Sequence, residues 1–327
     1  MTAVASLGPW PGTDQLLEQT RLFEAFSSLP TGIEGCPALA RLPGMYADGM
    51  VGRTAGVLAG YLPMEYGPHG WRLADHTGRD QEQAAETLRR DLEALAVAGV
   101  GYAGPLVMAV LGPVTFGART YLKGSDVLLA DPGAVTDVAA ALATAVEEQL
   151  AQTGSEIPGA DPFPLIQEPA LGAALAGRLP TFTGRGTLRT ISRPEATELL
   201  SPLVGTAVVA TGVAAIPAAR DAGARTVALD VSNLTDRAWE TVAEWVESGG
   251  SVWAEVLGRP DENAPAPTPN EIAALLDGWT NVGLSVSGLA SLTLAAGASL
   301  GRLSPAEASE RVAVIGNAAE ILAERAA

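Results

Sequence analysis

The sequence has few of the residues that link, ligate or attract nucleic acids. Cys36 is the only cysteine, so no disulfide can form within the chain. Lys123 is the only lysine, and the 327 residues carry a net charge of −17 without any cluster of basic residues. Nucleic acids and anionic membranes bind basic patches, so we expect neither of them as a partner.

The sequence also lacks a long uninterrupted apolar stretch. The longest, around residues 207–219, contains Gly212 and Pro217 and is too short to span a bilayer. No basic segment precedes an apolar one at the N-terminus, as it would in a secretory signal peptide. We therefore expect a cytoplasmic protein. Apolar residues make up 47% of the chain, which is enough for a sizeable core.

Short apolar runs alternate with segments of helical periodicity along the whole chain. The runs are apolar on both faces, as strands buried in a parallel sheet are. About eight strands, each followed by a helix, predict an α/β fold of the (β/α)₈ TIM-barrel type, in a single domain over residues 1–327. A doubly wound open sheet is the alternative. The expected strands are 4–7, 106–111, 164–166, 207–210, 226–230, 251–256 and 292–295, with a further candidate near 60–65.

Helix starts are marked by capping residues. Asp131 precedes a proline, which suits the first position of a helix. Ser192, Thr268 and Ser304 are each followed three residues later by a glutamate, the pattern of a capping box. These signals predict helices that begin directly after residues 131, 192, 268 and 304.

Three segments at strand ends carry distinctive motifs. They read LGPWPGTD over residues 7–14, LGPVTF over 111–116 and LIQEPAL over 165–171. In this order they resemble the catalytic barrel of the cobalamin-independent methionine synthases, which show I-G-S-x-P, G-P-V-T and Q-x-D-E-P. The resemblance extends from residue 6 to about residue 310. It implies a barrel that transfers a methyl group from methyl-tetrahydrofolate to homocysteine, with a zinc ion that lowers the thiol pKa.

The residues that would hold zinc in that family are largely missing. The family uses a histidine, two cysteines and a glutamate, with H-x-C after the fifth strand. The matching segment here reads VVATGV over residues 208–213, and Ala298 stands at the place of the last cysteine. His69, His76 and Cys36 lie far upstream, at a spacing that matches no metal signature. We therefore expect no metal site, and no zinc or other cofactor.

The amino-acid pocket implied by the resemblance also differs. Pro9 stands at the serine of I-G-S and has no N–H to donate. Gln167 stands at the aspartate that would meet the substrate ammonium, while Glu168 is retained. We expect Glu168 and Asp230, both at strand ends, as catalytic residues, although Glu168 is also explained as a charge at a helix start. Further substrate-binding candidates are Gly8, Trp10, Thr115, Gln167, Trp253 and Glu255.

The sequence thus predicts a diverged or inactive methionine-synthase-like protein. Its partner would be a small molecule such as an amino acid, a thiol or a folate, in an acidic pocket with an apolar wall. One alternative is a non-catalytic barrel that binds a small molecule or a protein. Another is a metal-free lyase or decarboxylase that works through carboxylates, as in the related uroporphyrinogen decarboxylase branch. The arginine-rich entry segment of that branch is absent here.

Overall fold

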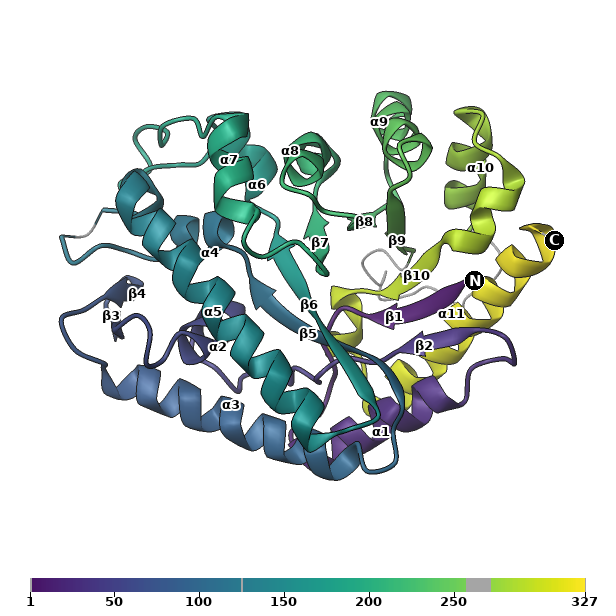
Figure 1. The fold of residues 1–327 in the computed structure, drawn as a ribbon, viewed down its shortest axis with the longest axis horizontal. Coiled ribbons are helices and arrows are strands. Elements are labelled where there is room, and N and C mark those ends of the chain that lie inside the picture. The colour runs from purple at the N-terminus through teal and green to yellow at the C-terminus, as the bar shows by residue number, and fades with distance from the viewer. Residues whose placement is uncertain (1, 125, 257–271, 327) are drawn as a thin grey trace.

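The computed structural model describes residues 2–124, 126–256 and 272–326, without the side chains of residues 298 and 299. Eight parallel strands form a barrel with helices packed around it, which confirms the predicted fold (Figure 1). Their order in the sheet is β2-β1-β10-β9-β8-β7-β6-β5. The strands are β1 (Ala3–Ser6), β2 (Glu34–Cys36), β5 (Gly104–Leu111), β6 (Ala160–Glu168), β7 (Val208–Thr211), β8 (Thr226–Asp230), β9 (Ser251–Glu255) and β10 (Thr293–Ala296).

The first and last strands of this sheet, β2 and β5, meet just beyond the end of β2. The Val107 N–H donates to the Pro37 carbonyl at 2.9 Å, and the Leu39 N–H donates to the Val107 carbonyl at 3.0 Å. Ala38 and Val107 form a parallel bridge. These bonds bring the two ends of the sheet together, as a closed barrel requires.

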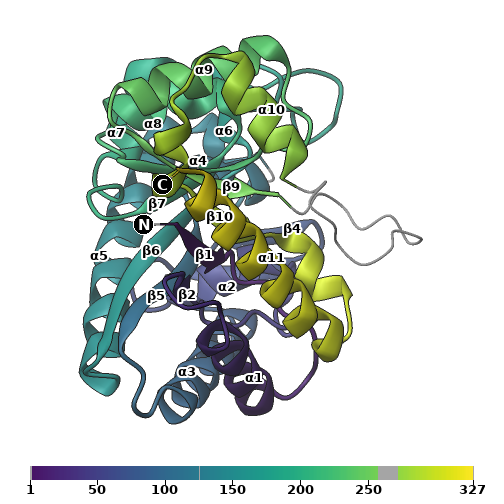
Figure 2. The same cartoon turned by 90° about the vertical axis from the view of Figure 1, so that its right-hand side faces the viewer.

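Helices occupy the connections between the strands. In Figure 2, α1 and α11, which come from opposite ends of the chain, lie side by side outside the barrel. No helix of the described residues is both long and apolar enough to cross a membrane. The α-helices are α1 (Gln15–Ser27), α2 (Met50–Val57), α3 (Arg79–Ala98), α4 (Pro113–Arg119), α5 (Pro132–Glu156), α6 (Leu171–Leu175), α7 (Arg193–Leu200), α8 (Ile216–Asp221), α9 (Asp236–Glu247), α10 (Ala273–Asn281) and α11 (Pro305–Ala326).

The candidate strand near residues 60–65 is wrong as a barrel strand. Residues 64–67 form β3 (Met64–Gly67), which pairs with β4 (Gly70–Leu73) in an antiparallel hairpin outside the barrel. The second barrel strand is instead β2, with the sequence Glu-Gly-Cys. Three residues without an apolar run give no periodic signal, so only the backbone pairing of β2 with β1 reveals this strand.

The helix starts predicted at residues 131, 192 and 304 are confirmed. Asp131 caps α5 by accepting hydrogen bonds from two backbone N–H groups of its first turn. Ser192 caps α7 by accepting one from Glu195. Ser304 and Glu307 form a capping box at the start of α11, in which the Ser304 N–H donates to the Glu307 carboxylate at 2.7 Å. The start predicted at Thr268 lies outside the described residues.

Small side chains dominate the barrel interior, which leaves room for one tryptophan. Trp253 fills this space and meets Phe163 edge-on, with ring centroids 5.9 Å apart. The interior residues are Ala5, Leu7, Cys36, Ala38, Val107, Leu165, Val208, Ala228, Trp253 and Ala295. This packed layer closes the barrel below its C-terminal end, so a ligand has room only above it.

The buried position of Cys36 predicts an unreactive thiol. Burial, with a smaller effect of nearby Glu34, raises the pKa of Cys36 to about 12. Because the thiolate is the reactive form, we expect the folded protein to react with a disulfide reagent at least about a hundredfold more slowly than the unfolded protein. Stopped-flow measurement near pH 8, with and without denaturant, tests this. Equal rates in the two states would show that Cys36 is accessible.

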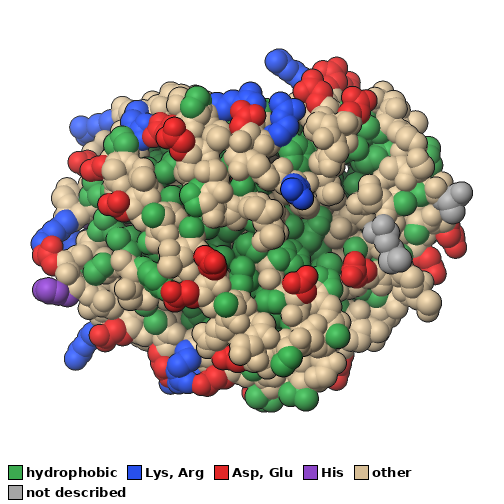
Figure 3. Space-filling model, viewed as in Figure 1, with side chains coloured by type: hydrophobic (Ala, Val, Ile, Leu, Met, Phe, Trp, Pro, Cys, Tyr) green, Lys and Arg blue, Asp and Glu red, His purple; other side chains and the backbone are tan. Residues whose placement is uncertain are grey.

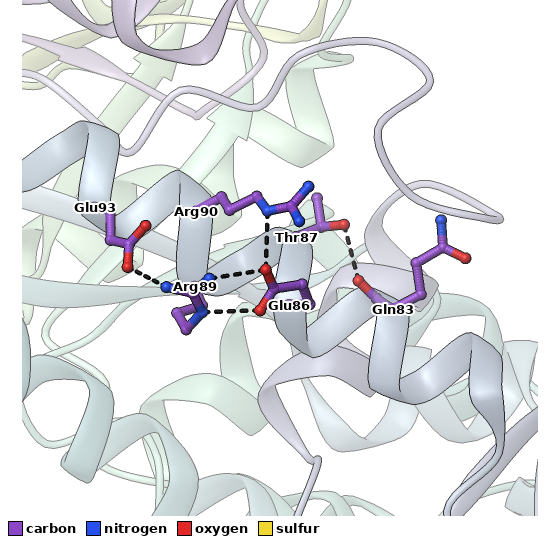
Figure 4. A network of polar contacts seen from close by, with 6 residues as sticks. All are labelled: Gln83, Glu86, Thr87, Arg89, Arg90 and Glu93. Carbon is purple, nitrogen blue, oxygen red and sulfur yellow. Dashed lines mark hydrogen bonds and ion pairs between the residues drawn. The ribbon is translucent and has the colours of Figure 1, made fainter.

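The molecular surface carries many carboxylates. The face in Figure 3 has hydrophobic side chains gathered at its centre with acidic side chains around them. On α3, Glu86 accepts hydrogen bonds from Arg89 and Arg90, and Arg89 also contacts Glu93 (Figure 4). The hydrogen bonds from Arg89 lower the pKa of Glu86 to about 2. All four side chains are exposed, so this network adds little stability and lies outside the barrel.

Candidate functional site

A pocket of about 420 Å³ opens at the C-terminal ends of the barrel strands. In TIM-barrel enzymes this end carries the active site, because the loops that follow the strands meet there. We call this hollow the mouth pocket. It is lined by Leu7, Pro9, Arg41, Gln167, Pro169, Ala210, Thr211, Gly212, Ala228, Asp230 and Glu255.

Two larger hollows lie elsewhere on the described part of the chain. One of about 740 Å³ lies between α9 and α10, with four carboxylates and no basic group in its lining. The other, of about 580 Å³, includes Glu34 and Gly104, which are the first residues of β2 and β5. The first has no barrel-strand residue in its lining, and the second includes the starts of two strands and, of the strand ends, only Pro37 after the short β2, so size alone does not make either of them the better candidate.

Strand alternation brings three of the predicted residues into the mouth pocket. Gln167, Asp230 and Glu255 come from β6, β8 and β9, and each lies two residues after a side chain of the barrel interior. Side chains two apart in a strand point to the same side, so these three form the layer above the packed interior. Glu255 and Trp253, two residues apart in β9, therefore share a side of the sheet. Contact of these three residues with a ligand stays a prediction.

The two carboxylates of this layer are direct neighbours. Asp230 and Glu255 are partners in the register of β8 and β9, on adjacent parallel strands. The Ser232 N–H donates to Asp230 Oδ1 at 2.9 Å and holds this carboxylate in place. Glu255 lies against Gly297, where an added Cβ would come within 1.5 Å of Glu255 Oε1. A glycine after β10 therefore makes the space that the Glu255 side chain occupies.

Glu168 has a different environment from its neighbour Gln167. It is fully buried and accepts hydrogen bonds from the N–H groups of Val114 and Thr115, at 2.9 and 2.8 Å, and from the Thr115 hydroxyl at 2.6 Å. The carboxylate thus caps the N-terminus of α4, whose dipole favours a negative charge there. Consecutive strand residues face opposite sides, so Gln167 faces the pocket while Glu168 faces the helix.

Gly112 is part of the same arrangement. A Cβ at this position would lie 2.3 Å from Glu168 Oε1, so the strand end approaches the carboxylate closely only without a side chain. Burial raises the pKa of Glu168 to about 7, against the opposing effect of the three hydrogen bonds. Neither Glu168 nor Thr115 lines the mouth pocket, and their observed contacts join β6 to α4. A catalytic role for Glu168 stays a prediction that these contacts do not support.

The turn after β1, which contains Gly8 and Trp10, has its hydrogen-bonding groups engaged within the protein. Gly8 has a φ of +104°, which a residue with a side chain rarely adopts. Its N–H donates to Ser6 Oγ at 3.1 Å, and its carbonyl accepts from the Arg41 N–H at 2.8 Å. Trp10 is fully buried, and its indole N–H donates to Glu18 Oε2 at 3.2 Å. Neither Gly8 nor Trp10 lines the mouth pocket.

Trp253 also lies outside the pocket lining. It is paired in register with Ala228 and lies in the interior layer directly below the mouth. It therefore supports the floor of the pocket through packing, and contact with a ligand stays a prediction.

Arg41 is the charged residue of the pocket lining that sequence reasoning missed. It follows β2 in the segment that pairs with the turn after β1, as a Pro9–Arg41 bridge. No motif marks it, since its place in the pocket depends on the short strand that periodicity did not reveal. Its positive charge modifies the predicted acidic pocket, whose lining otherwise combines Asp230 and Glu255 with the expected apolar wall.

Among the described residues, the lining of the mouth pocket includes no histidine or cysteine that could bind zinc. The end of β7 supplies Ala210, Thr211 and Gly212 to the pocket, none of which is a nitrogen or sulfur ligand. Cys36 lies in the packed interior, and His69 contacts the Phe182 ring at 4.8 Å between centroids. Within the described residues, no group of three or more histidine, cysteine, aspartate or glutamate side chains is placed to hold a metal ion.

Comparisons with known proteins place the fold. No family model matches the sequence, and no curated protein matches it either. Among solved structures, the chain is similar to a B12-independent methionine synthase from a Shewanella species, in complex with selenomethionine. The TM-score is 0.59 at 11% identity, over 98% of this chain and 97% of that chain. Likeness at this identity shows the fold alone: the chain is a TIM barrel that follows the fold of a methionine synthase over nearly its whole length.

Proposed function

We propose that this chain is a diverged methionine-synthase-like barrel that binds a small molecule in the mouth pocket. The observation that carries the proposal is the convergence of Gln167, Asp230 and Glu255, from three strands, at the C-terminal end of the barrel. Polar groups on rigid strands above a packed floor are what a specific small-molecule site needs. The similarity of the fold to that of a methionine synthase, over 98% of the chain, supports the methionine-synthase-like part of the proposal.

The proposal includes divergence from zinc-dependent methyl transfer to homocysteine. That reaction needs a metal to generate the thiolate, and the side chains at the end of β7 do not provide its ligands. Gln167 is neutral, so it cannot meet a substrate ammonium as a carboxylate would. We therefore assign no step of catalysis to a metal in this protein.

A second candidate function is metal-free lyase or decarboxylase chemistry. The adjacent carboxylates Asp230 and Glu255 favour it, because they lie side by side at the ends of β8 and β9 and both line the mouth pocket. Such a pair can donate a proton from one member and accept one at the other. The binding proposal does not depend on this chemistry, but both need the same two residues.

Thermal-shift screening with amino acids, thiols and folates tests the proposal. We expect a ligand of these classes to raise the melting temperature of the wild type. In Asp230→Asn and Glu255→Gln that shift should fall by at least half, while the melting temperature without ligand stays close to that of the wild type. Both substitutions keep side-chain size, so the loss would report lost charge at the pocket.

Asp236→Asn is the matched control, because Asp236 lines the hollow between α9 and α10. Retained ligand shifts in the two pocket variants, or a shift lost in Asp236→Asn, would place the site elsewhere. Methylation of homocysteine at a rate close to that of an authentic family enzyme would contradict the proposed divergence.

A further inference from the structure

Arg41 is held firmly at the rim of the mouth pocket by its own backbone. Its N–H donates to the Gly8 carbonyl at 2.8 Å, and its carbonyl accepts from the Trp10 N–H at 3.1 Å. These two bonds attach the segment after β2 to the turn after β1. The backbone of Arg41 is therefore already ordered, and its side chain lines the pocket. Binding a ligand there would cost little further backbone entropy.

The charge of Arg41 has no counter-ion among the described residues. None of their carboxylates lies within ion-pair distance of its guanidinium, and the guanidinium makes no side-chain hydrogen bond to any of them. Burial and the nearby cation of Arg53 lower the pKa of Arg41 to about 10. A mostly buried cation without a partner is costly, and a bound anion is what would offset that cost.

The neighbouring arginine does not share this property. Arg53 is buried, and its Nη1 donates to Asp91 Oδ2 at 3.2 Å. The Tyr46 hydroxyl donates to the same oxygen at 2.6 Å, and the Arg53 guanidinium lies 5.7 Å from the Tyr46 ring centroid. Asp91 therefore balances Arg53 inside the protein. Of the two adjacent arginines, Arg41 is the one whose charge faces the pocket unbalanced.

We propose that Arg41 is an anion-binding residue of the mouth pocket and that it holds a carboxylate or similar small oxyanion of the ligand. The inference rests on the proposed function, since it concerns the same pocket. A guanidinium presents two parallel N–H groups to an oxyanion, which gives both strength and orientation. The oxyanion lies toward the Arg41 side, away from Asp230 and Glu255, whose negative charges would repel it.

Four probes of similar length separate the possible ligand chemistries. They are pentanoate, n-butyl phosphate, n-butylamine and pentanamide, and their binding is measured by isothermal titration or saturation-transfer NMR. We expect pentanoate to bind the wild type more tightly than its neutral isostere pentanamide. In Arg41→Met, pentanoate affinity should fall at least about tenfold, the loss expected for a charge-assisted pair, while pentanamide affinity changes little. Tighter binding of n-butyl phosphate than of pentanoate would identify the oxyanion as a phosphate.

Two controls separate a specific effect from damage to the fold. Arg41→Lys keeps the charge and should retain part of the pentanoate affinity, and Arg178→Met removes an exposed arginine and should change nothing. If Arg41→Met does not fold, phenylglyoxal labelling of the wild type with peptide mapping replaces it. Pentanoate should then protect Arg41 from labelling and leave Arg178 unprotected.

The outcomes distinguish this inference from the proposed function. If pentanamide or n-butylamine binds while pentanoate does not, or if Arg41→Met binds pentanoate as the wild type does, Arg41 is not an anion site but the pocket still binds small molecules. Binding of all four probes that is unaffected by Asp230→Asn, Glu255→Gln and Arg41→Met would overturn both. Both proposals would also be overturned if none of the four probes bound and none of the amino acids, thiols and folates in the screen bound either.

Discussion

Replacing Glu168 with alanine should lower the free energy of unfolding by at least about 3 kcal/mol, because three buried donors lose their acceptor at a cost of about 1–3 kcal/mol each. The donors are the N–H groups of Val114 and Thr115 and the Thr115 hydroxyl, all bonded to this one carboxylate. Urea denaturation followed by circular dichroism measures the change. Glu168→Gln should lower the free energy of unfolding by less than Glu168→Ala. Its amide oxygen still accepts a hydrogen bond, although its NH₂ group replaces the other acceptor oxygen and faces a donor there.

The effect of Glu168→Ala should also depend on pH. The pKa of Glu168 is raised in the folded protein to about 7 from an ordinary value of 4.5. The folded state thus binds more protons than the unfolded state between these values, so the contribution of Glu168 to stability is greatest below about pH 4.5 and falls as pH rises through 7. We expect Glu168→Ala to destabilise the protein more at about pH 5 than at about pH 8, by an amount on the order of 2–3 kcal/mol.

The matched control is Glu307→Ala, which removes an exposed helix-capping glutamate that bonds the Ser304 N–H. It should change stability far less than Glu168→Ala, because water replaces the lost acceptor at an exposed cap. Equal stability of Glu168→Ala and the wild type would show that α4 does not depend on this carboxylate. The catalytic interpretation of Glu168 would then regain weight.

Replacing Asp91 with asparagine should destabilise the protein by about 3–5 kcal/mol, since it leaves a buried cation without its partner. Asp91 Oδ2 accepts hydrogen bonds from both Tyr46 and Arg53. All three side chains are buried; Tyr46 lies in the segment before α2, Arg53 in α2 and Asp91 in α3. Burial raises the pKa of Asp91 despite the nearby Arg53 cation. Chemical denaturation near neutral pH measures the loss.

A double variant separates the cost of an unpaired charge from the worth of the pair. Arg53→Met with Asp91→Leu removes both charges and should be more stable than Asp91→Asn alone, because replacing both partners by apolar groups avoids an isolated buried ion. Asp221→Asn is the control, as Asp221 pairs with Arg193 on the surface and its loss should have little effect. If the double variant is no more stable than Asp91→Asn, the Asp91 network contributes through shape rather than charge.

Periodicity in the sequence was sufficient to predict the barrel. The strands that end at Leu111, Asp230 and Glu255 are apolar on both faces and separated by helical patterns, and such local signals need no knowledge of distant contacts. The capping residues Asp131, Ser192 and Ser304 bond to groups within a few residues of themselves, so the starts of their helices could also be predicted from the sequence. The strand β2 was not, because three residues without an apolar run carry no period.

The candidate site divides in the same way. The sequence determined that Asp230 and Glu255 end successive strands, so that both lie at the C-terminal end of the barrel. Only the tertiary structure decided that Glu168 turns away from its neighbour Gln167 to cap α4, because its partners lie more than fifty residues earlier in the chain. Closure of the barrel likewise brought Arg41 to the turn after β1. Contacts between such distant segments follow from how the strands pair and the helices pack, which no local pattern encodes.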